Sequence, residues 1–453
     1  MNAPPAHDTR RGRCVWLGEI EHARSRQLWS RSCVQAVADL LVVGRWDGRV
    51  TAFDRDSLDP RWTVDHHGRA VTMAPLSDRI VVGSRGDRGT IAAYDLDTGT
   101  QCWQYEAATD VGTATKDGIF ALPYVVALES EPAASLTHDH GRVYAVAQRY
   151  ERDGEHRRWQ SVVLAFDADG TVDWRYETDA SPIALSLGDR TAGAGSDEDG
   201  DGDGDGDAKP NTPLAVGYNR CLGDHDVGLV VLDADSGAVN WNWDPGTDGD
   251  RRVGDVAVHG DHVAVASHGD KCGYLLGPGG EERWRVPLAT ETDIEGETLY
   301  AYPNHVAIGD DHVAFVTGNT YAVESRETAS RHPNEHQIAV FDTDGTARWT
   351  AEIRGYAHEI ATTAASVVIP CAQNFRVRDP MTHGVRHFDL ETGAGTVLET
   401  EGIATAVALE SPSPSTSTAE SDVNTIGAVE EPVEYHDGDH SYGEYALRTW
   451  VLE

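Results

Sequence analysis

Lysine is scarce in this chain, and long apolar runs are absent. Lys116, Lys209 and Lys271 are the only lysines among 37 basic residues, so the other 34 are arginines. No stretch of 18 consecutive apolar residues occurs, and a helix needs about that many to cross a bilayer. We therefore expect no insertion into a membrane.

Cysteine and histidine do not group as metal or disulfide sites do. The six cysteines form no C-x-x-C pair, no adjacent pair and no C-x-x-C-H haem motif. Histidines recur beside Asp in short turns, which favours a structural role over metal binding. The Asp/Gly tract at 199–207 resembles a calcium loop but lacks the glutamate at its twelfth position. We expect no metal site.

Acidic residues far outnumber basic ones. With 75 Asp and Glu against 37 Lys and Arg, the net charge is −38. This excludes a protein that coats nucleic acid with its whole surface, and we expect no nucleic-acid partner. Such a surface is typical of a salt-loaded cytosol, where salt screens the repulsion between carboxylates; a specific basic partner is the alternative. Arg10-Arg11 is not followed by the apolar segment of an export signal, so we expect a cytoplasmic protein.

One motif recurs along the whole chain. Residues 93–103 read A-Y-D-L-D-T-G-T-Q-C-W, and degenerate copies follow or precede it at similar spacing. The Asp side chain is expected to bond the backbone of a turn, and Gly to supply its positive φ. The Trp then begins a returning strand and covers apolar area between neighbouring units. The tryptophans at this structural docking position are Trp29, Trp62, Trp103, Trp174, Trp241, Trp284 and Trp349.

A second pair of strand-like runs precedes each of these hairpins. Residues 70–76 and 80–83, joined by a turn at 77–79, are the clearest example. Each unit therefore holds four short antiparallel strands, which we name A to D in chain order. Four-stranded units repeated in tandem indicate an all-β propeller.

The 93–103 segment resembles the tryptophan-docking motif A-x-D-x-x-T-G-x-x-x-W of pyrroloquinoline-quinone-type (PQQ-like) propeller repeats, and matches it at every fixed position. The acidic composition points to a halophilic archaeal member. The resemblance implies a propeller scaffold but no particular chemistry. A resemblance to the quinoprotein dehydrogenases would imply a vicinal disulfide, against which the quinone stacks, and carboxylates that bind calcium. Because the chain has no adjacent cysteines, we expect neither PQQ nor another cofactor. The outer-membrane assembly lipoprotein BamB shares the scaffold, but no lipobox or signal precedes the repeats.

The repeat positions predict eight blades in a single domain spanning residues 1–453. Val397 replaces the docking Trp of the seventh. The closing blade is expected to take strands near 15–17 and 28–29 from the N-terminal part, and 403–409 and 445–452 from the C-terminal part, which would protect open sheet edges. A seven-bladed ring with loose ends is the alternative. The segments 194–208 and 410–441 are acidic and poor in apolar residues, so we expect disordered loops there.

The B–C connections differ from the rest of the chain in charge. Over 71 residues they carry 14 basic and 12 acidic residues, a net of +2, where the chain average would give about −6. Arginine with exposed aromatic side chains is typical of interaction surfaces, although long loops can be merely polar. The candidate partner-binding residues are Arg45, Trp46, Arg85, Arg149, Tyr150, Trp159, Arg220, Tyr321, Phe375 and Arg376.

These observations favour a non-enzymatic scaffold that binds a protein, or another anionic partner, through its B–C loop face. The alternative is an enzyme, either quinoprotein-like or a hydrolase or lyase, with its site at the mouth of the central channel. Candidates for that site are Lys116, Asp117, His358 and Glu359. No nucleophile elbow, zinc motif or phosphate loop supports the enzyme.

Overall fold

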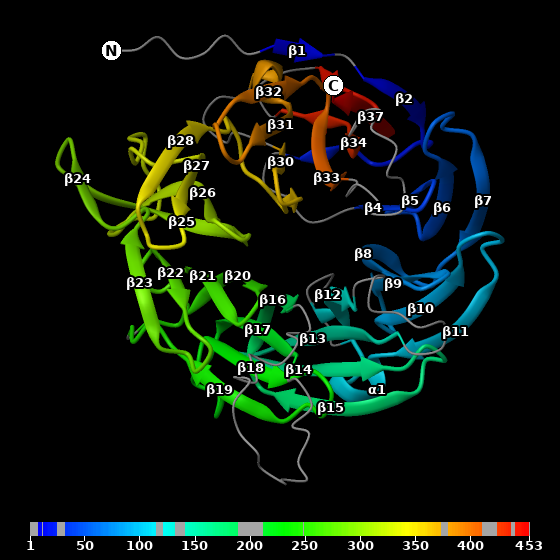
Figure 1. Ribbon diagram of the computed structural model, residues 1–453, viewed down its shortest axis with the longest axis horizontal. Coiled ribbons are helices and arrows are strands. Elements are labelled where there is room, and N and C mark those ends of the chain that lie inside the picture. Colours follow the sequence, from blue (N-terminus) through cyan, green and yellow to red (C-terminus); the bar gives the residue numbers. More distant parts are fainter. Residues whose placement is uncertain are drawn as a thin grey trace, which may run out of the picture.

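The computed structural model describes residues 8–10, 12–24, 32–114, 121–131, 141–188, 212–247, 249–372, 379–409, 424–435 and 440–452. Its described strands form antiparallel sheets arranged as blades around a central opening (Figure 1). The predicted all-β propeller is therefore confirmed. Predictions for Trp29, Lys116, Asp117, Phe375, Arg376 and the tract 194–208 lie outside the described residues.

Most of the described strands follow one another in antiparallel groups of four, which we number as blades in chain order; a single pairing between Arg85 and Tyr124 joins blades 2 and 3 into one eight-stranded sheet. Blade 1 holds β4 (Cys33–Val37), β5 (Leu40–Gly44), β6 (Arg49–Asp54) and β7 (Pro60–Asp65). Blade 2 holds β8 (Arg69–Leu76), β9 (Arg79–Arg85), β10 (Thr90–Asp95) and β11 (Gln101–Glu106). Blade 3 holds β12 (Tyr124–Ser130), β13 (Val143–Asp153), β14 (His156–Phe166) and β15 (Val172–Thr178). Blade 4 holds β16 (Ser181–Leu187), β17 (Pro213–Arg220), β18 (Leu229–Asp233) and β19 (Val239–Trp243).

The second half of the chain repeats the pattern with additions. Blade 5 holds β20 (Val253–His259), β21 (His262–Ser267), β22 (Cys272–Leu276) and β23 (Glu282–Pro287). Blade 6 holds β25 (Glu297–Ile308), β26 (His312–Ala322), β27 (Gln337–Asp342) and β28 (Ala347–Glu352), with β24 (Thr292–Ile294) beside β25. Blade 7 holds β29 (Ala361–Thr362), β30 (Ser366–Cys371), β31 (Gly384–Asp389) and β32 (Gly395–Leu398). The helical segments are short. One is α1 (Ala108–Val111) and another is a 3-10 turn (Pro380–Thr382), and both lie in connections.

No helix among the residues described here is long and apolar enough to cross a membrane.

Both ends of the chain complete blade 8, but not as expected. It is built from β33 (Ile403–Leu409), β34 (Asn424–Glu431), β37 (Ala446–Leu452) and β2 (Arg13–Trp16). Among the described residues the N-terminal part contributes one strand to this sheet, β2, which is its outer strand; the strand expected near 28–29 lies outside those residues. Further N-terminal pairings are parallel: β1 (Asp8–Arg10) joins β32, and β3 (Ala23–Arg24) joins β35 (Val433–Glu434), which also pairs with β36 (Ser441–Tyr442).

The expectation of a disordered loop over 410–441 is wrong for residues 424–431, which form β34. The sequence prediction took the acidic residues of this segment to be exposed to solvent. Glu430 and Glu431 of β34 are instead buried and have hydrogen-bond partners within the protein. Glu430 binds Arg448 and accepts a hydrogen bond from the Gly402 amide at 2.6 Å. Glu431 accepts from the hydroxyl of Ser32 at 3.2 Å. Buried charges are tolerated when they are paired in this way.

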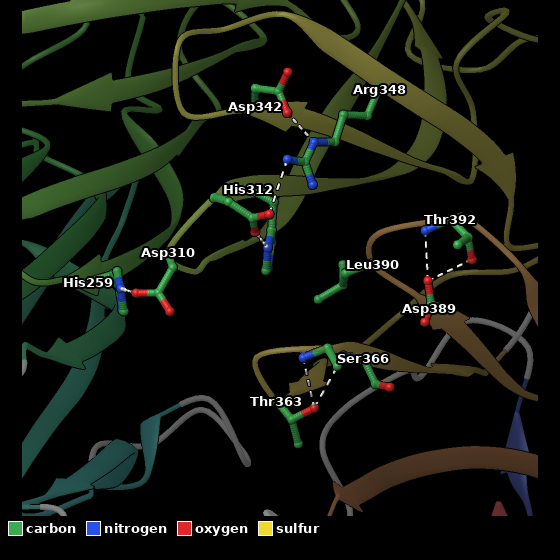
Figure 2. A network of polar contacts seen from close by, with 12 residues as sticks. His259, Asp310, His312, Asp342, Arg348, Thr363, Ser366, Asp389, Leu390 and Thr392 are labelled. Atoms are coloured by element: carbon green, nitrogen blue, oxygen red, sulfur yellow. Dashed lines mark hydrogen bonds and ion pairs between the residues drawn. The ribbon is translucent and has the colours of Figure 1, made fainter. Parts of the chain in front are cut away.

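The repeated Asp-Gly-Trp motif holds each of blades 1 to 6 to the next blade. Asp389 Oδ1 accepts hydrogen bonds from the amide and hydroxyl of Thr392 at 2.7 and 2.6 Å, which closes the C–D turn of blade 7 (Figure 2). The indole of Trp349, on blade 6, donates to the Leu390 carbonyl of that turn at 2.9 Å. A Cβ added at Gly393 would lie 2.8 Å from the Trp349 ring. Glycine is therefore needed both for its positive φ and for the room it leaves to the tryptophan of the preceding blade.

The same contact recurs around the ring. Indole nitrogens donate to the next blade's turn carbonyl from Trp62 at 2.7 Å, Trp103 at 3.0 Å, Trp174 at 3.0 Å and Trp284 at 2.8 Å. Trp241 packs its ring against Gly280 of the next turn. At the ring closure Arg13 of β2 makes the corresponding contact, donating to the carbonyls of Asp56 and Arg55.

Histidines of the A–B turns pair with neighbouring acids. His312 Nδ1 lies 2.9 Å from Asp311 Oδ1. His259 Nε2 lies 2.8 Å from Asp310 Oδ1 of the adjacent blade (Figure 2). These contacts agree with the structural role predicted for the recurrent histidines.

Candidate functional site

The first strands of the blades surround a central channel. Its cavity has a volume of about 1470 Å³. Because strands alternate in direction, the B–C and D–A connections emerge at the same end of the channel. We call this end the mouth face; it includes connections 45–48, 86–89, 221–228 and 268–271.

Blades 2 and 3 bring three of the candidate residues to the channel wall. Arg85, which is 8% exposed, places its guanidinium carbon 3.7 Å from the centre of the Tyr124 ring. Tyr150 packs on Trp159 with ring centres 5.3 Å apart. The sequence analysis treated 148–160 as a loop, but β13 and β14 continue through it as a hairpin with a turn at 154–155. The cross-strand pair Tyr150–Trp159 is part of that extension.

Blades 4 to 6 add a belt of cations and tyrosines. Arg220 and Arg251 are joined by an isolated β-bridge at the mouth face. The guanidinium of Arg251 lies 4.9 Å from the centre of the Tyr302 ring, and the ammonium of Lys271 lies 5.4 Å from it. Tyr302 also contacts Tyr321, with ring centres 5.5 Å apart. Cations held over aromatic faces in this way form a rigid, positively charged surface.

Two predicted arginines serve the fold instead. Arg45 is 7% exposed and binds Asp47 at 2.8 Å. Arg149 is 8% exposed, and its Nε donates to the Val111 carbonyl at 2.7 Å. Both arginines are as buried as Arg85, and each bonds within the chain. Trp46 is half-buried, with the guanidinium of Arg69 4.3 Å above its ring.

Several residues of the mouth face were not predicted from the sequence. Arg251 precedes β20, Tyr302 lies within β25, and His268 follows β21. Arg251 and Tyr302 fall outside the B–C connections, and His268 is neither basic nor counted as aromatic there. Including the D–A connections, which share this end of the ring, would have found Arg251.

A layer of titratable groups lies deeper in the channel. His305 Nδ1 lies 3.4 Å from Asp255 Oδ2, and its Nε2 donates to the Ala357 carbonyl at 3.1 Å. The carboxylate of Asp255 outweighs burial and raises the pKa of His305. Glu359 accepts a hydrogen bond from the Val407 amide at 2.6 Å, while burial raises its pKa to about 7. Burial lowers the pKa of His358 to about 4.

Two enzyme candidates therefore reach the channel, His358 and Glu359. Across the part of the chain that the structure describes, no group of three or more His, Cys, Asp or Glu is placed to hold a metal ion. Both ring nitrogens of His305 already have partners. The layer thus holds the Asp255–His305 pair beside the buried side chains of His358 and Glu359, rather than an open ligand cage.

Comparison with known proteins identifies the repeat. The family model described as "Outer membrane protein assembly factor BamB" matches residues 6–118, 46–207 and 225–394. A quinohemoprotein alcohol dehydrogenase, ADH-IIG of Pseudomonas putida, is 31% identical over 118 residues, which are 22% of this chain and 16% of that protein. The chain therefore matches only a small part of this curated relative's length.

Solved structures show the same fold at low identity. Sqt1 of Saccharomyces cerevisiae superposes with a TM-score of 0.59 at 11% identity, covering 98% of both chains. The quinohemoprotein alcohol dehydrogenase of Comamonas testosteroni has a TM-score of 0.50 at 13% identity, covering 92% of this chain and 74% of that one. Since the family model spans most of the sequence, the chain belongs to the PQQ-like β-propeller repeat family typified by BamB.

Proposed function

We propose that this propeller is a non-enzymatic scaffold that holds a protein partner against its mouth face. The observation that carries the proposal is the cluster of Arg85, Arg157, Arg220 and Arg251 around the channel of a chain whose net charge is −38. Arginine and tyrosine dominate the energetics of protein interfaces. The same cavity is lined by four acidic residues, so these arginines supply local positive charge on an otherwise acidic body, which favours the approach of an acidic segment to this place.

The family description supports the same class of role. BamB is described as an assembly factor for outer membrane proteins, which is a role in handling other proteins. We transfer only that class to this chain: the recognition of a protein segment.

The enzyme alternative has less support from the channel residues. We propose that the ring works without PQQ, because the described residues do not fit the set that the dehydrogenases imply. The cysteines are free and none is adjacent to another in sequence. In the deeper layer Glu359 bonds to the Val407 amide and His305 to Asp255 and the Ala357 carbonyl, whereas His358 Nε2 has no hydrogen-bond partner.

Charge reversal at the rim tests the scaffold directly. Arg157 and Arg326 are exposed on blades 3 and 6, and Arg326 lies 4.8 Å from the centre of the Tyr321 ring. We expect Arg157→Glu with Arg326→Glu to lose most of the proteins that the immobilised wild type captures from an extract of its own cells, as measured by quantitative mass spectrometry.

The matched control reverses a charge far from the mouth. Arg283→Glu alters an outer-strand arginine whose side chain is 51% exposed and which pairs with Glu281. It should retain the captured set. Equal capture by the rim variant and the wild type would overturn the proposed function.

A further inference from the structure

Four polar residues converge on the channel wall where blades 4 and 5 meet. Asn219 and Arg220 end β17, Arg251 lies beside them across the β-bridge, and His268 follows β21. All four side chains line the cavity. The His268 ring packs against the Tyr302 ring with centres 4.6 Å apart, and Arg251 lies over the same tyrosine.

Hydrogen bonds determine which nitrogen of His268 carries the proton. Arg251 Nη1 donates to Asn219 Oδ1 at 3.2 Å, which orients the amide. Asn219 Nδ2 then donates to the Val253 carbonyl and to His268 Nδ1, both at 2.7 Å. Because Nδ1 accepts, the neutral ring carries its hydrogen on Nε2. Burial, with the nearby charge of Arg251, lowers the pKa of His268 to about 3 and keeps the ring neutral.

By geometry His268 Nε2 has no hydrogen-bond partner; the Asn304 side chain lies next to the ring, and His268 is 7% exposed. An unsatisfied buried donor costs about 1–3 kcal/mol. Gly254 preserves this arrangement, since a Cβ there would lie 2.4 Å from the imidazole. His268 Nε2 is itself buried beside Gly254, and the His268 side chain lies on the wall of the channel cavity.

The charges that act on His268 are positive, those of Arg251, Lys271 and His305. The cavity as a whole is also lined by Glu129, Glu131, Asp255 and Glu359. Burial and the neighbouring charges of Arg251 and Arg157 lower the pKa of Arg220. The acidic partner of Arg220 is Asp250, 3.9 Å away with a side chain that is 62% exposed. A second buried donor, Arg85 Nε, also lacks a hydrogen-bond partner on the same cavity wall. Together these groups offer N–H donors and little acceptor capacity, which suits an oxyanion.

We propose that Asn219, Arg220, Arg251 and His268 form a binding site for the carboxylate of an acidic peptide segment. The planar guanidinium groups match a carboxylate, and His268 Nε2 supplies a neutral donor to the same group. The cavity of about 1470 Å³ and the adjoining tyrosines exceed what a small free anion would fill. The site rests on the proposed function, because it names the part of the partner that enters the channel.

Peptide binding provides the test. The probe is a fluorescein-labelled, amidated hexaglutamate peptide, titrated by anisotropy at low salt, with acetate and inorganic phosphate as competitors. We expect the wild type to bind it, and Arg251→Gln and His268→Gln each to weaken binding about tenfold or more, which corresponds to the loss of one charge-assisted or buried hydrogen bond. Arg283→Gln, on outer strand β23, should bind as the wild type does.

A nitrogen-15 spectrum of the histidines provides a second readout. The His268 Nε2 signal should shift when the peptide is added to the wild type, and thermal melts should show that each variant is folded. No binding by the wild type, equal affinity of the Arg251→Gln and Arg283→Gln variants, or a shift produced by phosphate but not by the peptide would each overturn the proposal.

This failure is distinguishable from failure of the scaffold. If the rim variant loses partner capture while Arg251→Gln leaves peptide affinity unchanged, the carboxylate site is wrong and the scaffold stands. If neither capture nor peptide affinity responds to any mouth variant, both are wrong.

Discussion

The two ends of the ring are built by opposite rules. At the C–D turns one contact repeats: the Trp of each of blades 1 to 6 packs over the glycine turn of the next blade, as Trp103 does over Gly170. At the mouth face the blades differ more: blades 2 and 4 end their second strands with Arg85 and Arg220, whereas blade 6 supplies Tyr302 and Tyr321. Repeated residues hold the ring together, whereas the residues that occur once distinguish this propeller from others.

Removing one repeated contact should have the largest effect on stability. Trp103→Ala removes a ring stacked on Phe166 at 5.5 Å and a hydrogen bond to the next blade. We expect a loss of about 3 kcal/mol in the free energy of unfolding, measured by urea denaturation. Trp16→Ala is the matched control because Trp16 is 61% exposed; an equal loss in both variants would contradict the interlocking role.

The turn glycine should come next. Gly170 has a φ of 81°, and an added Cβ would meet the Trp103 ring at 2.5 Å. Gly154 has a φ of 60° but nothing within 4 Å of such a Cβ. Both Ala variants incur the left-handed backbone cost of about 1–2 kcal/mol. Only Gly170→Ala also brings a Cβ against the Trp103 ring, so it should lower the melting temperature more than Gly154→Ala does. Equal melting temperatures of the two variants would show that the Trp103 ring moves aside without cost, which would contradict this prediction.

The channel interior offers a smaller, pH-dependent effect. Burial raises the pKa of Glu359 to about 7, from an ordinary value of 4.5. A raised pKa contributes stability that is present below about pH 4.5 and is lost as pH rises through 7. Glu359→Gln keeps an oxygen for the Val407 amide but cannot ionise. We expect the variant to match the wild type near pH 4.5 and to be more stable above pH 7.

Thermal melts of both proteins at pH 4.5, 6 and 8 would check this. Their comparison cancels the titration of the many surface carboxylates that the two proteins share. A stability difference that does not change with pH would contradict the assignment to Glu359.

The sequence revealed the repeated end of the ring and only part of the other. Asp, Gly and Trp at constant spacing suffice to locate the blades, because each turn obeys the same local chemistry. The environment of an arginine depends instead on neighbours far away in the chain. Arg149 donates a hydrogen bond to the Val111 carbonyl, whereas Arg251 donates to Asn219 and lies over the Tyr302 ring. The strand at 424–431 was missed because its glutamates are satisfied by Arg448, Ser32 and Gly402 rather than by water.

Site-specific photo-cross-linking tests the central claim most directly. A benzophenone amino acid placed at Tyr150, on the channel wall, should cross-link a partner in its native extract, and the cross-link should map to an acidic segment of that partner. The same group at exposed Trp16, on outer strand β2, should give no such product. Cross-links that form at Trp16 but not at Tyr150 would contradict the account.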